Sequence, residues 1–281
     1  MPASTRTIAL TSGFGVGTFA GLMGLGGAEL RMPILIRQFG LPPQRAVPVN
    51  LAVSLATLTV GAFTRLAVVS MDTSRLGWEI VAVAVGSVIA ALISSSLLHR
   101  LPDGLHTKLI AVVLLAVACL MAFAPMMNSP GHGLVPEGHG VRLAAGFGIG
   151  LLVGTVSAMF GVAGGQMTIP ALVFGFGLDL KLAGTASLLI NLPTVFTAVV
   201  RFAARSEGRA NSDLKLIALP MAVGSVVGAA TGGVFVNFVP TPLLRLVFAA
   251  VLAASAIALL RRKSTAQSPA SLTTSPEPPR S

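Results

Sequence analysis

Charged residues are scarce in this chain. Asp, Glu, Lys and Arg together make up 10% of its 281 residues, whereas they make up roughly a quarter of a soluble domain. Hydrophobic residues make up 54%, so the chain has too little charge to cover a folded surface in water. Charge-free runs such as 80–98 and 109–127 reach the length of about 18 residues that a transmembrane helix needs. We therefore predict an all-α integral membrane protein.

Residues that carry most enzyme and cofactor chemistry are also scarce. Cys119 is the only cysteine, which excludes an intrachain disulfide. The four histidines have no Cys or carboxylate partners at metal-ligand spacing. The sequence contains no phosphate-binding glycine loop, no nucleophile elbow and no zinc-binding helix motif. We therefore expect no enzyme activity, no cofactor, no metal site and no ATP-driven pumping.

Basic residues outnumber acidic ones, 19 to 9. They stand singly in the expected connections and are not interleaved with aromatic residues. This distribution is typical of loops beside anionic lipid rather than of a nucleic-acid interface. We expect the lipid bilayer, and no nucleic acid, as a partner.

The chain contains an internal repeat. GLGGAELRMPILIRQFGL, which begins at Gly24, aligns without gaps with GVAGGQMTIPALVFGFGL, which begins at Gly161. The offset is 137 residues there and 138 further along. We predict about eight transmembrane segments arranged as two homologous four-segment repeats, near 8–36, 46–68, 78–98, 107–127, 143–176, 183–203, 215–238 and 243–260. The first repeat spans 8–127, a loop spans 128–141, the second repeat spans 142–262, and the tail 263–281 is expected to be disordered.

Two layouts fit a repeat of this kind. Eight single crossings make the halves parallel, whereas re-entrant first and fifth segments make them inverted. The connections after the second and sixth segments are the more basic ones and contain Arg65, Arg75, Arg201, Arg205, Arg209 and Lys215. Basic connections favour the cytoplasm, so we favour eight crossings with both termini cytoplasmic.

Glycines are placed in two different ways in the first and fifth segments. Gly13, Gly17 and Gly21, like Gly146, Gly150 and Gly154, are spaced by four, a pattern typical of close helix packing. The adjacent pairs Gly26-Gly27 and Gly164-Gly165 lie about six residues before Pro33 and Pro170. Two neighbouring glycines lie on different faces of a helix, so packing against one partner helix does not require both. We therefore interpret these pairs, each followed by a proline, as helix breaks. Lipid cannot satisfy the freed backbone groups, so each break should face protein or a watery cavity.

Polar residues accompany both breaks. Glu29 and Arg31 align with Gln166 and Thr168. Charged residues inside a bilayer are costly. Glu29 and Arg31 therefore either extend to the membrane interface or face a site between the breaks. We favour the site. Arg31 would attract an anion, while Glu29 would either pair with Arg31 or carry a coupling proton. If residues 29–31 are unwound, the two side chains point the same way.

The second and sixth segments carry matching polar residues. Asn50, Ser54 and Thr57 align with Ser187, Asn191 and Thr194 and share one helix face in each segment. Residues of this kind either join membrane helices or contact a ligand, and both alternatives stay open.

The duplicated motifs GLGGAELRMP and GVAGGQMTIP, with the AGTASLLINLP stretch that contains Thr185, resemble the TauE/SafE family of membrane permeases over residues 8–262. The resemblance implies transport of sulfite, sulfonates or related organic anions across the bacterial inner membrane. Ala28, Glu29 and Arg31 depart from the usual family pattern of a third glycine followed by aliphatic residues, which leaves the exact substrate open.

The sequence therefore predicts a multi-pass inner-membrane secondary transporter for a small organic anion, coupled to protons or to the membrane potential. A passive anion channel is the alternative, followed by a structural membrane subunit. The sequence specifies neither the oligomeric state nor the direction of transport. The candidate substrate-binding residues are Gly26, Gly27, Glu29, Arg31, Asn50, Ser54, Gly164, Gly165, Gln166, Thr168, Thr185, Ser187 and Asn191.

Overall fold

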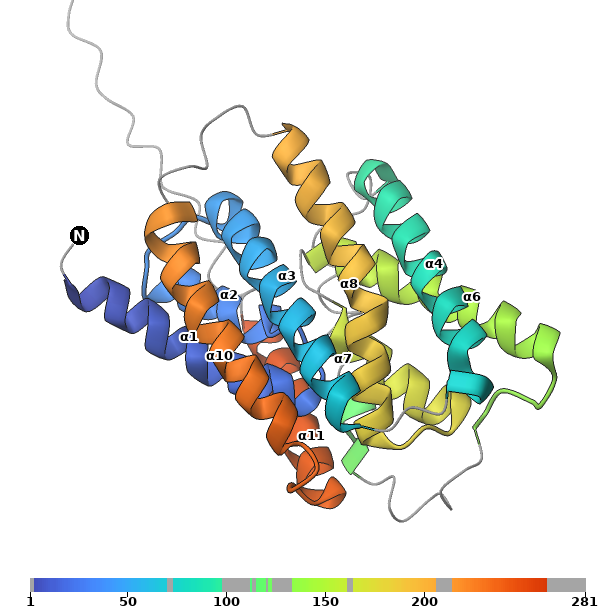
Figure 1. The fold of residues 1–281 in the computed structure, drawn as a ribbon. Coiled ribbons are helices and arrows are strands. Elements are labelled where there is room, and N and C mark those ends of the chain that lie inside the picture. Colours follow the sequence, from blue (N-terminus) through green and yellow to red (C-terminus); the bar gives the residue numbers. More distant parts are fainter. Residues whose placement is uncertain are drawn as a thin grey trace, which may run out of the picture.

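The computed structural model describes residues 3–69, 73–97, 112, 115–119, 121–122, 133–160, 164–205 and 214–261, and this part of the chain consists of helices joined by short turns and loops. The first half contains α1 (Ala3–Met23), α2 (Ala28–Arg37), α3 (Pro43–Val68) and α4 (Thr73–Leu97). The second contains α6 (His139–Phe160), α7 (Gly165–Pro170), the π-helical turn η2 (Ala171–Gly175), α8 (Leu180–Arg205), η3 (Leu214–Ala218), α10 (Leu219–Phe235) and α11 (Thr241–Arg261). Figure 1 shows them as one helical bundle.

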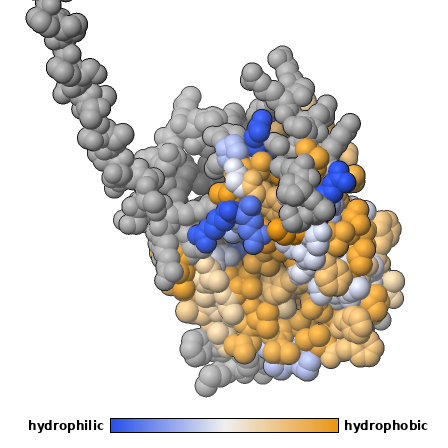
Figure 2. Space-filling view, turned by 90° about the vertical axis from the view of Figure 1, so that its left-hand side faces the viewer, coloured by the Kyte–Doolittle hydropathy of each residue, from blue (hydrophilic) through white to orange (hydrophobic). Residues whose placement is uncertain are grey.

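The apolar helices fit a membrane. Three helical stretches among the described residues are long and apolar enough to cross one, namely Arg45–Val68, Leu180–Ala204 and Leu216–Phe235, and the shorter Gly77–Ile93 and Thr241–Ile257 are also apolar. Figure 2 shows a broad hydrophobic surface with hydrophilic residues gathered towards its upper part. The expectation of an all-α fold is confirmed for the described residues, and their apolar helices are consistent with a membrane protein. The fourth expected segment is described only in part, and the expected disordered tail lies outside the described residues.

Close contacts between glycines and backbone join each half to the other. A Cβ atom on Gly13 or Gly17 of α1 would overlap the carbonyl oxygens of Met221 or Ser225 in α10. The positions that align with these residues meet in the same way, because Gly150 and Gly154 of α6 lie against the backbone of Val83 and Ser87 in α4. The prediction that these glycines pack helices together is confirmed. In each half the first predicted segment packs on the third predicted segment of the other half, α1 on α10 and α6 on α4.

The same contacts define helix directions. Residue numbers rise together along α1 and α10, so these helices are parallel. Arg65, in the last turn of α3, reaches the carbonyl oxygens of Gly21 and Leu22 in the last turn of α1, so α3 runs the same way as α1. The chain must therefore turn back between Met23 and Pro43, and α2 makes this return.

The second half repeats this reversal in the opposite orientation. α6 runs parallel to α4, and Arg201 near the end of α8 bonds the carbonyls of Ala91 and Leu92 near the end of α4. α6 and α8 therefore run the same way, and the stretch that contains α7 returns. Arg65 at the end of α3 also bonds the carbonyl oxygen of Lys181 at the start of α8, so α3 and α8 are antiparallel (Figure 1).

These directions fit the re-entrant layout, and the favoured layout of eight single crossings is not confirmed. The count of basic residues placed Arg65 in a connection. Arg65 is in fact a fully buried residue of α3. It satisfies backbone carbonyls inside the bundle, so its charge carries no information about the side of the membrane.

Close packing at Gly13 predicts a matched pair of variants. Gly13→Ala places a methyl group against the backbone of Met221 and should lower the free energy of unfolding by about 1–3 kcal/mol. Gly15→Ala, two residues along α1, has no atom within 4 Å of the new methyl group and should leave stability unchanged or slightly higher. Thermal unfolding of the detergent-solubilised protein, followed by circular dichroism, compares the two. Equal melting temperatures would contradict this account of the α1–α10 contact.

Candidate functional site

Two helix interruptions lie against each other in the bundle. α1 ends at Met23 and α2 begins at Ala28, with Gly24 and Gly27 in the left-handed region at φ 79° and 69°. α6 ends at Phe160, and Gly164, at φ 64°, precedes α7. Glycine adopts this conformation without a steric cost. Both breaks predicted from the sequence are present, although Gly26 and Gly165 themselves do not have a positive φ.

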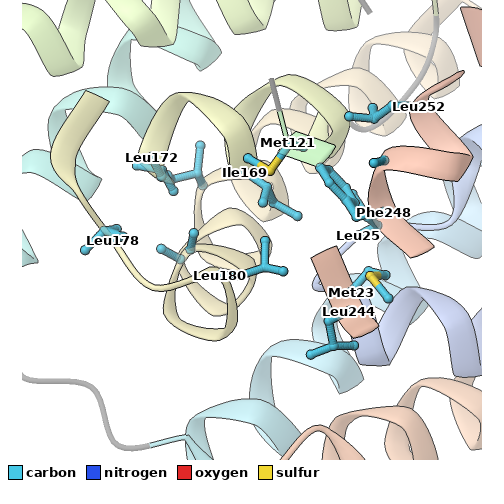
Figure 3. Close-up of a cluster of buried hydrophobic side chains, with 14 of the residues drawn as sticks. Met23, Leu25, Met121, Ile169, Leu172, Leu178, Leu180, Leu244, Phe248 and Leu252 are labelled. Carbon is cyan, nitrogen blue, oxygen red and sulfur yellow. The ribbon is translucent and has the colours of Figure 1, made fainter. Parts of the chain in front are cut away.

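Leu25 joins the two breaks. Its Cδ2 atom lies 2.7 Å from the position that a Cβ on Gly165 would take, so the chains touch there. Leu25 also belongs to a buried hydrophobic cluster with Ile169 of α7 and Phe248 of α11, and Figure 3 shows these side chains together. The apolar contact brings the two interrupted helices to one place.

The two prolines lie beyond the breaks, inside helical structure. Pro33 is within α2, and Pro170 ends α7 just before the π-helical turn. Because proline has no N–H group, the carbonyl groups four residues earlier, those of Glu29 and Gln166, lack their usual helical donor. Both breaks therefore present a backbone acceptor at equivalent places.

Arg31 is the centre of the first break's polar network. The residue is fully buried. Its Nη1 donates to Ser54 Oγ at 2.9 Å and to Asn50 Oδ1 at 3.5 Å, and its Nη2 donates to Thr57 Oγ1 at 3.2 Å and to Ser225 Oγ at 3.3 Å. Every one of these acceptors is neutral. The guanidinium is thus solvated by hydroxyl and amide oxygens from α3 and α10 instead of by water.

The acceptors around Arg31 are themselves held in place. Asn50 Nδ2 donates to the carbonyl oxygen of Ala28 at 3.1 Å, which ties the first turn of α2 to α3. Ser225 Oγ donates to the carbonyl oxygen of Gly13 at 3.0 Å. Ser225 was not among the candidate residues, although it lies in the Gly-Ser-Val triplet that the repeat duplicates. That duplication was the signal that could have identified it.

Glu29 does not pair with Arg31. Both of its carboxylate oxygens are buried, and neither has a hydrogen-bond partner among the described residues. The expected unwound stretch is also absent, because residues 29–31 belong to α2. Two residues along an α-helix rotate a side chain by about 200°, so Glu29 and Arg31 point in different directions. The interpretation that the two charges face the same way is therefore wrong.

Arg65 forms a second buried cluster with one of the candidate residues. Its Nη1 donates to the carbonyl oxygens of Gly21 and Leu22 at 3.0 and 2.9 Å, and its Nη2 donates to that of Lys181 at 2.6 Å. Its Nε donates to Thr185 Oγ1 at 3.1 Å. Carbonyls at the end of a helix have no intrahelical donor, so this one side chain caps α1 at the break. Sequence reasoning missed this role, because an arginine near the end of an apolar span does not by itself indicate which groups it bonds.

The second break has neutral partners only. Asn191 Nδ2 donates to Ser187 O and Ser187 Oγ at 2.7 and 2.9 Å, while its Oδ1 is buried without a partner. Thr168 Oγ1 donates to the carbonyl oxygen of Gly164 at 3.1 Å, and Gln166 Nε2 donates to Ser255 Oγ of α11 at 3.3 Å.

Several of the candidate residues form three groups, whereas the Glu29 carboxylate has no hydrogen-bond partner among the described residues and Gln166 bonds Ser255 instead. Arg31, Asn50 and Ser54 form one network beside Gly27, and Thr185 belongs to the Arg65 cluster. Gly164, Ser187 and Asn191 form the third group. Among the described residues no three His, Cys, Asp or Glu side chains gather where they could hold a metal ion.

The capping role of Arg65 gives a prediction about stability. Arg65→Met leaves the carbonyls of Gly21, Leu22 and Lys181 without this donor, and each unsatisfied buried acceptor costs about 1–3 kcal/mol. We expect the free energy of unfolding in detergent to fall by at least about 2 kcal/mol. Arg37→Met, at the exposed end of α2, is the matched control and should change it by less than about 0.5 kcal/mol. An equal effect of both substitutions would refute the capping role.

Comparison with known proteins identifies a family. The family model described as Sulfite exporter TauE/SafE matches residues 8–259 of the chain. No curated protein and no solved structure gives a significant match. Because the family match covers most of the 281 residues, the chain belongs to the TauE/SafE family, and the resemblance noted in its repeated motifs is confirmed. It is a multi-pass membrane protein of a family that transports sulfite and related sulfur-containing anions.

Proposed function

We propose that this member of the TauE/SafE family is a secondary transporter that carries sulfite or a small organosulfonate across the bacterial inner membrane, through a site between the two helix breaks. The observation that carries the proposal is the meeting of two interrupted helices, with a fully buried arginine in the first turn of one of them. In transporters, discontinuous helices of this kind surround the substrate near the middle of the bilayer.

The helix directions support an inverted-repeat design. In this design, the α1–α2 and α6–α7 hairpins each enter and leave on one side, and three further segments of each half cross the membrane. The antiparallel directions of α3 and α8 make the two halves opposite in orientation. Such a pair of halves alternates access to a central site by exchanging equivalent conformations. Both termini then lie on one side, which we assign to the cytoplasm because Arg6 and the basic end of α11 lie there.

The first break supplies positive potential for an anion. Gly27 provides no side-chain cap for α2, so the first N–H groups of this helix remain available, and the positive end of the helix dipole favours an anion. Arg31 adds a full charge one turn away. Because all its present acceptors are neutral, exchanging some of them for sulfite oxygens would form stronger, charge-assisted hydrogen bonds. Its Nε is buried without a partner and offers a further donor.

Glu29 suits the coupling step. A carboxylate that is buried without a hydrogen-bond partner is costly when ionised, and taking up a proton removes that cost. Proton uptake and release at Glu29 would link the state of this residue to the side on which the site is open. The alternative driving force is the membrane potential, which is worth about 2.3 kcal/mol for each elementary charge at 100 mV. A passive anion channel remains the second candidate function, since the same breaks could line a selective pore.

The role of Arg31 can be tested with a charge-conserving variant. Arg31→Lys keeps the charge but removes the planar fork that bonds several oxygens, so we expect the KM for sulfite in proteoliposomes to rise about tenfold or more, which is a loss of about 1.4 kcal/mol. Arg37→Lys, at the exposed end of α2, is the control. A monodisperse elution profile and a melting temperature near that of the parent protein would establish folding. A folded Arg31→Lys variant with an unchanged KM for every transported anion would remove Arg31 from the substrate site.

Glu29→Gln separates coupling from translocation. If Glu29 carries the coupling proton, this variant should lose uptake driven by a pH gradient but retain exchange of labelled for unlabelled sulfite at equal pH, because exchange needs no net proton movement. The measurement compares both modes in the same proteoliposomes. Normal gradient-driven uptake by Glu29→Gln would exclude Glu29 as the proton carrier. Flux that neither saturates nor shows exchange would favour the channel.

A further inference from the structure

The two breaks have the same construction but different charges. Positions related by the 137-residue offset are Gly27 and Gly164, Arg31 and Thr168, Ser54 and Asn191, and Ala20 and Ser157. The first half therefore serves as an internal reference for the second. Where the first half has a charged side chain and the second half does not, either another group takes its place in the second half or the place stays empty.

In the first half, a guanidinium occupies the face of the left-handed glycine. Nη2 of Arg31 lies 3.2 Å from the position that a Cβ on Gly27 would take, and the neighbouring contacts there are the apolar side chains of Val16 and Ala20. The same guanidinium donates only to neutral oxygens of α3 and α10. A fixed cation thus fills this position.

In the second half, oxygen atoms converge on the equivalent face. Asn191 Oδ1 lies 3.1 Å, and Ser157 Oγ 3.2 Å, from the position that a Cβ on Gly164 would take. Asn191 is only 1% exposed, and its Oδ1 has no hydrogen-bond partner. Ser187 Oγ lies beside them, 2.9 Å from Asn191 Nδ2. The shorter Thr168 side chain supplies no cation here.

The orientation of the Asn191 amide is determined by its neighbour. Nδ2 lies 2.7 Å from the carbonyl oxygen of Ser187, which can only accept a hydrogen bond. The nitrogen must therefore face Ser187, and the oxygen must face Gly164. The unpartnered atom is an acceptor, so it calls for a cation or a hydrogen-bond donor and would repel an anion.

The end of α6 adds negative potential. A helix C-terminus carries about half a negative charge, and Ser157, in the last turn of α6, lies at this position. In the first half Arg65 neutralises the corresponding end of α1, but the two residues that align with Arg65, at positions 202 and 203, are Phe and Ala. The nearest arginine, Arg201, donates instead to carbonyls of α4.

We propose that the second break binds a monovalent cation of the size of Na⁺, with Asn191 Oδ1 and Ser157 Oγ as ligands and Ser187 Oγ beside them. The bound ion takes the place that the Arg31 guanidinium has in the first half. Neutral oxygens without a carboxylate suit a monovalent rather than a divalent ion, since Ca²⁺ and Mg²⁺ sites are built with carboxylates. Binding of the ion does not depend on the proposed function, whereas its use as a coupling ion for anion transport rests on that function.

The test measures ion-dependent stability without a transported anion. The melting temperature of the purified protein is recorded in chloride solutions of constant ionic strength in which Na⁺ replaces choline or K⁺. We expect a saturable rise with Na⁺ in the parent protein. Asn191→Ala should shift the half-saturating Na⁺ concentration at least tenfold upwards. Thr197→Val is the control, because Thr197 lies further along α8 and bonds only its own helix at Pro193, and it should respond like the parent.

A second variant places an arginine in the second break, at the position that Arg31 has in the first. Thr168→Arg supplies a tethered guanidinium at the position that aligns with Arg31, so it should abolish the Na⁺ response while its melting temperature in choline is no lower than that of the parent. Saturable ²²Na⁺ binding to the parent protein serves as a direct readout if either variant fails to fold. Absence of both ²²Na⁺ binding and a Na⁺-specific stability gain, or a Na⁺ response that persists in folded Asn191→Ala, would overturn the site and leave an ordered water there.

Transport measurements then separate the two proposals. Na⁺ binding without flux of sulfite or of any small organosulfonate would refute the transport function and leave the cation site standing. Sulfite flux that is independent of Na⁺ in a protein that binds Na⁺ would refute the coupling role alone.

Discussion

The structure depends on one constraint, which is that backbone groups released by a broken helix must find partners where no water or lipid can provide them. At the first break Arg65 meets this requirement for the end of α1. Arg65 donates to the last carbonyls of α1 and also to the start of α8. It therefore links the end of the interrupted helix α1 to the second half of the chain. Arg31 is in turn held by Asn50, which also bonds the backbone of Ala28. The interruption is therefore a supported feature of the fold.

Close glycine contacts determine where this support lies. α1 packs on α10 and α6 packs on α4 through contacts so short that a side chain larger than hydrogen does not fit. Each hairpin is consequently bound to the opposite half, and a movement of one half relative to the other has to carry the hairpin with its partner helix. The contact between Leu25 and Gly165 places both breaks at the boundary where such movement would act.

The two halves share a scaffold but differ in electrostatics. Glu29 and Arg31 give the first break one charge of each sign, whereas Gln166 and Thr168 leave the second break neutral. A buried charge is expensive, so a fixed guanidinium is retained only where oxygens solvate it, as those of Ser54, Thr57 and Ser225 do. The second break presents oxygens of the same kind, including an unpartnered one on Asn191, without a cation of its own. This asymmetry is the basis of the two proposals, an anion site at the first break and a cation site at the second.

Local patterns in the sequence were sufficient for the membrane class, both glycine breaks and the packing role of Gly13, Gly17, Gly150 and Gly154. These features follow from residue spacing along one helix and from the shortage of charge, and both can be read without knowing the neighbours. The reversal at α2, the burial of Arg65 and the partnership of Arg31 with Ser225 were decided only by tertiary structure, because they depend on which helices meet and in which direction. From the sequence alone, an arginine in an apolar span that lies in a loop cannot be distinguished from one that caps another helix. Only the contacts across the bundle distinguish the two.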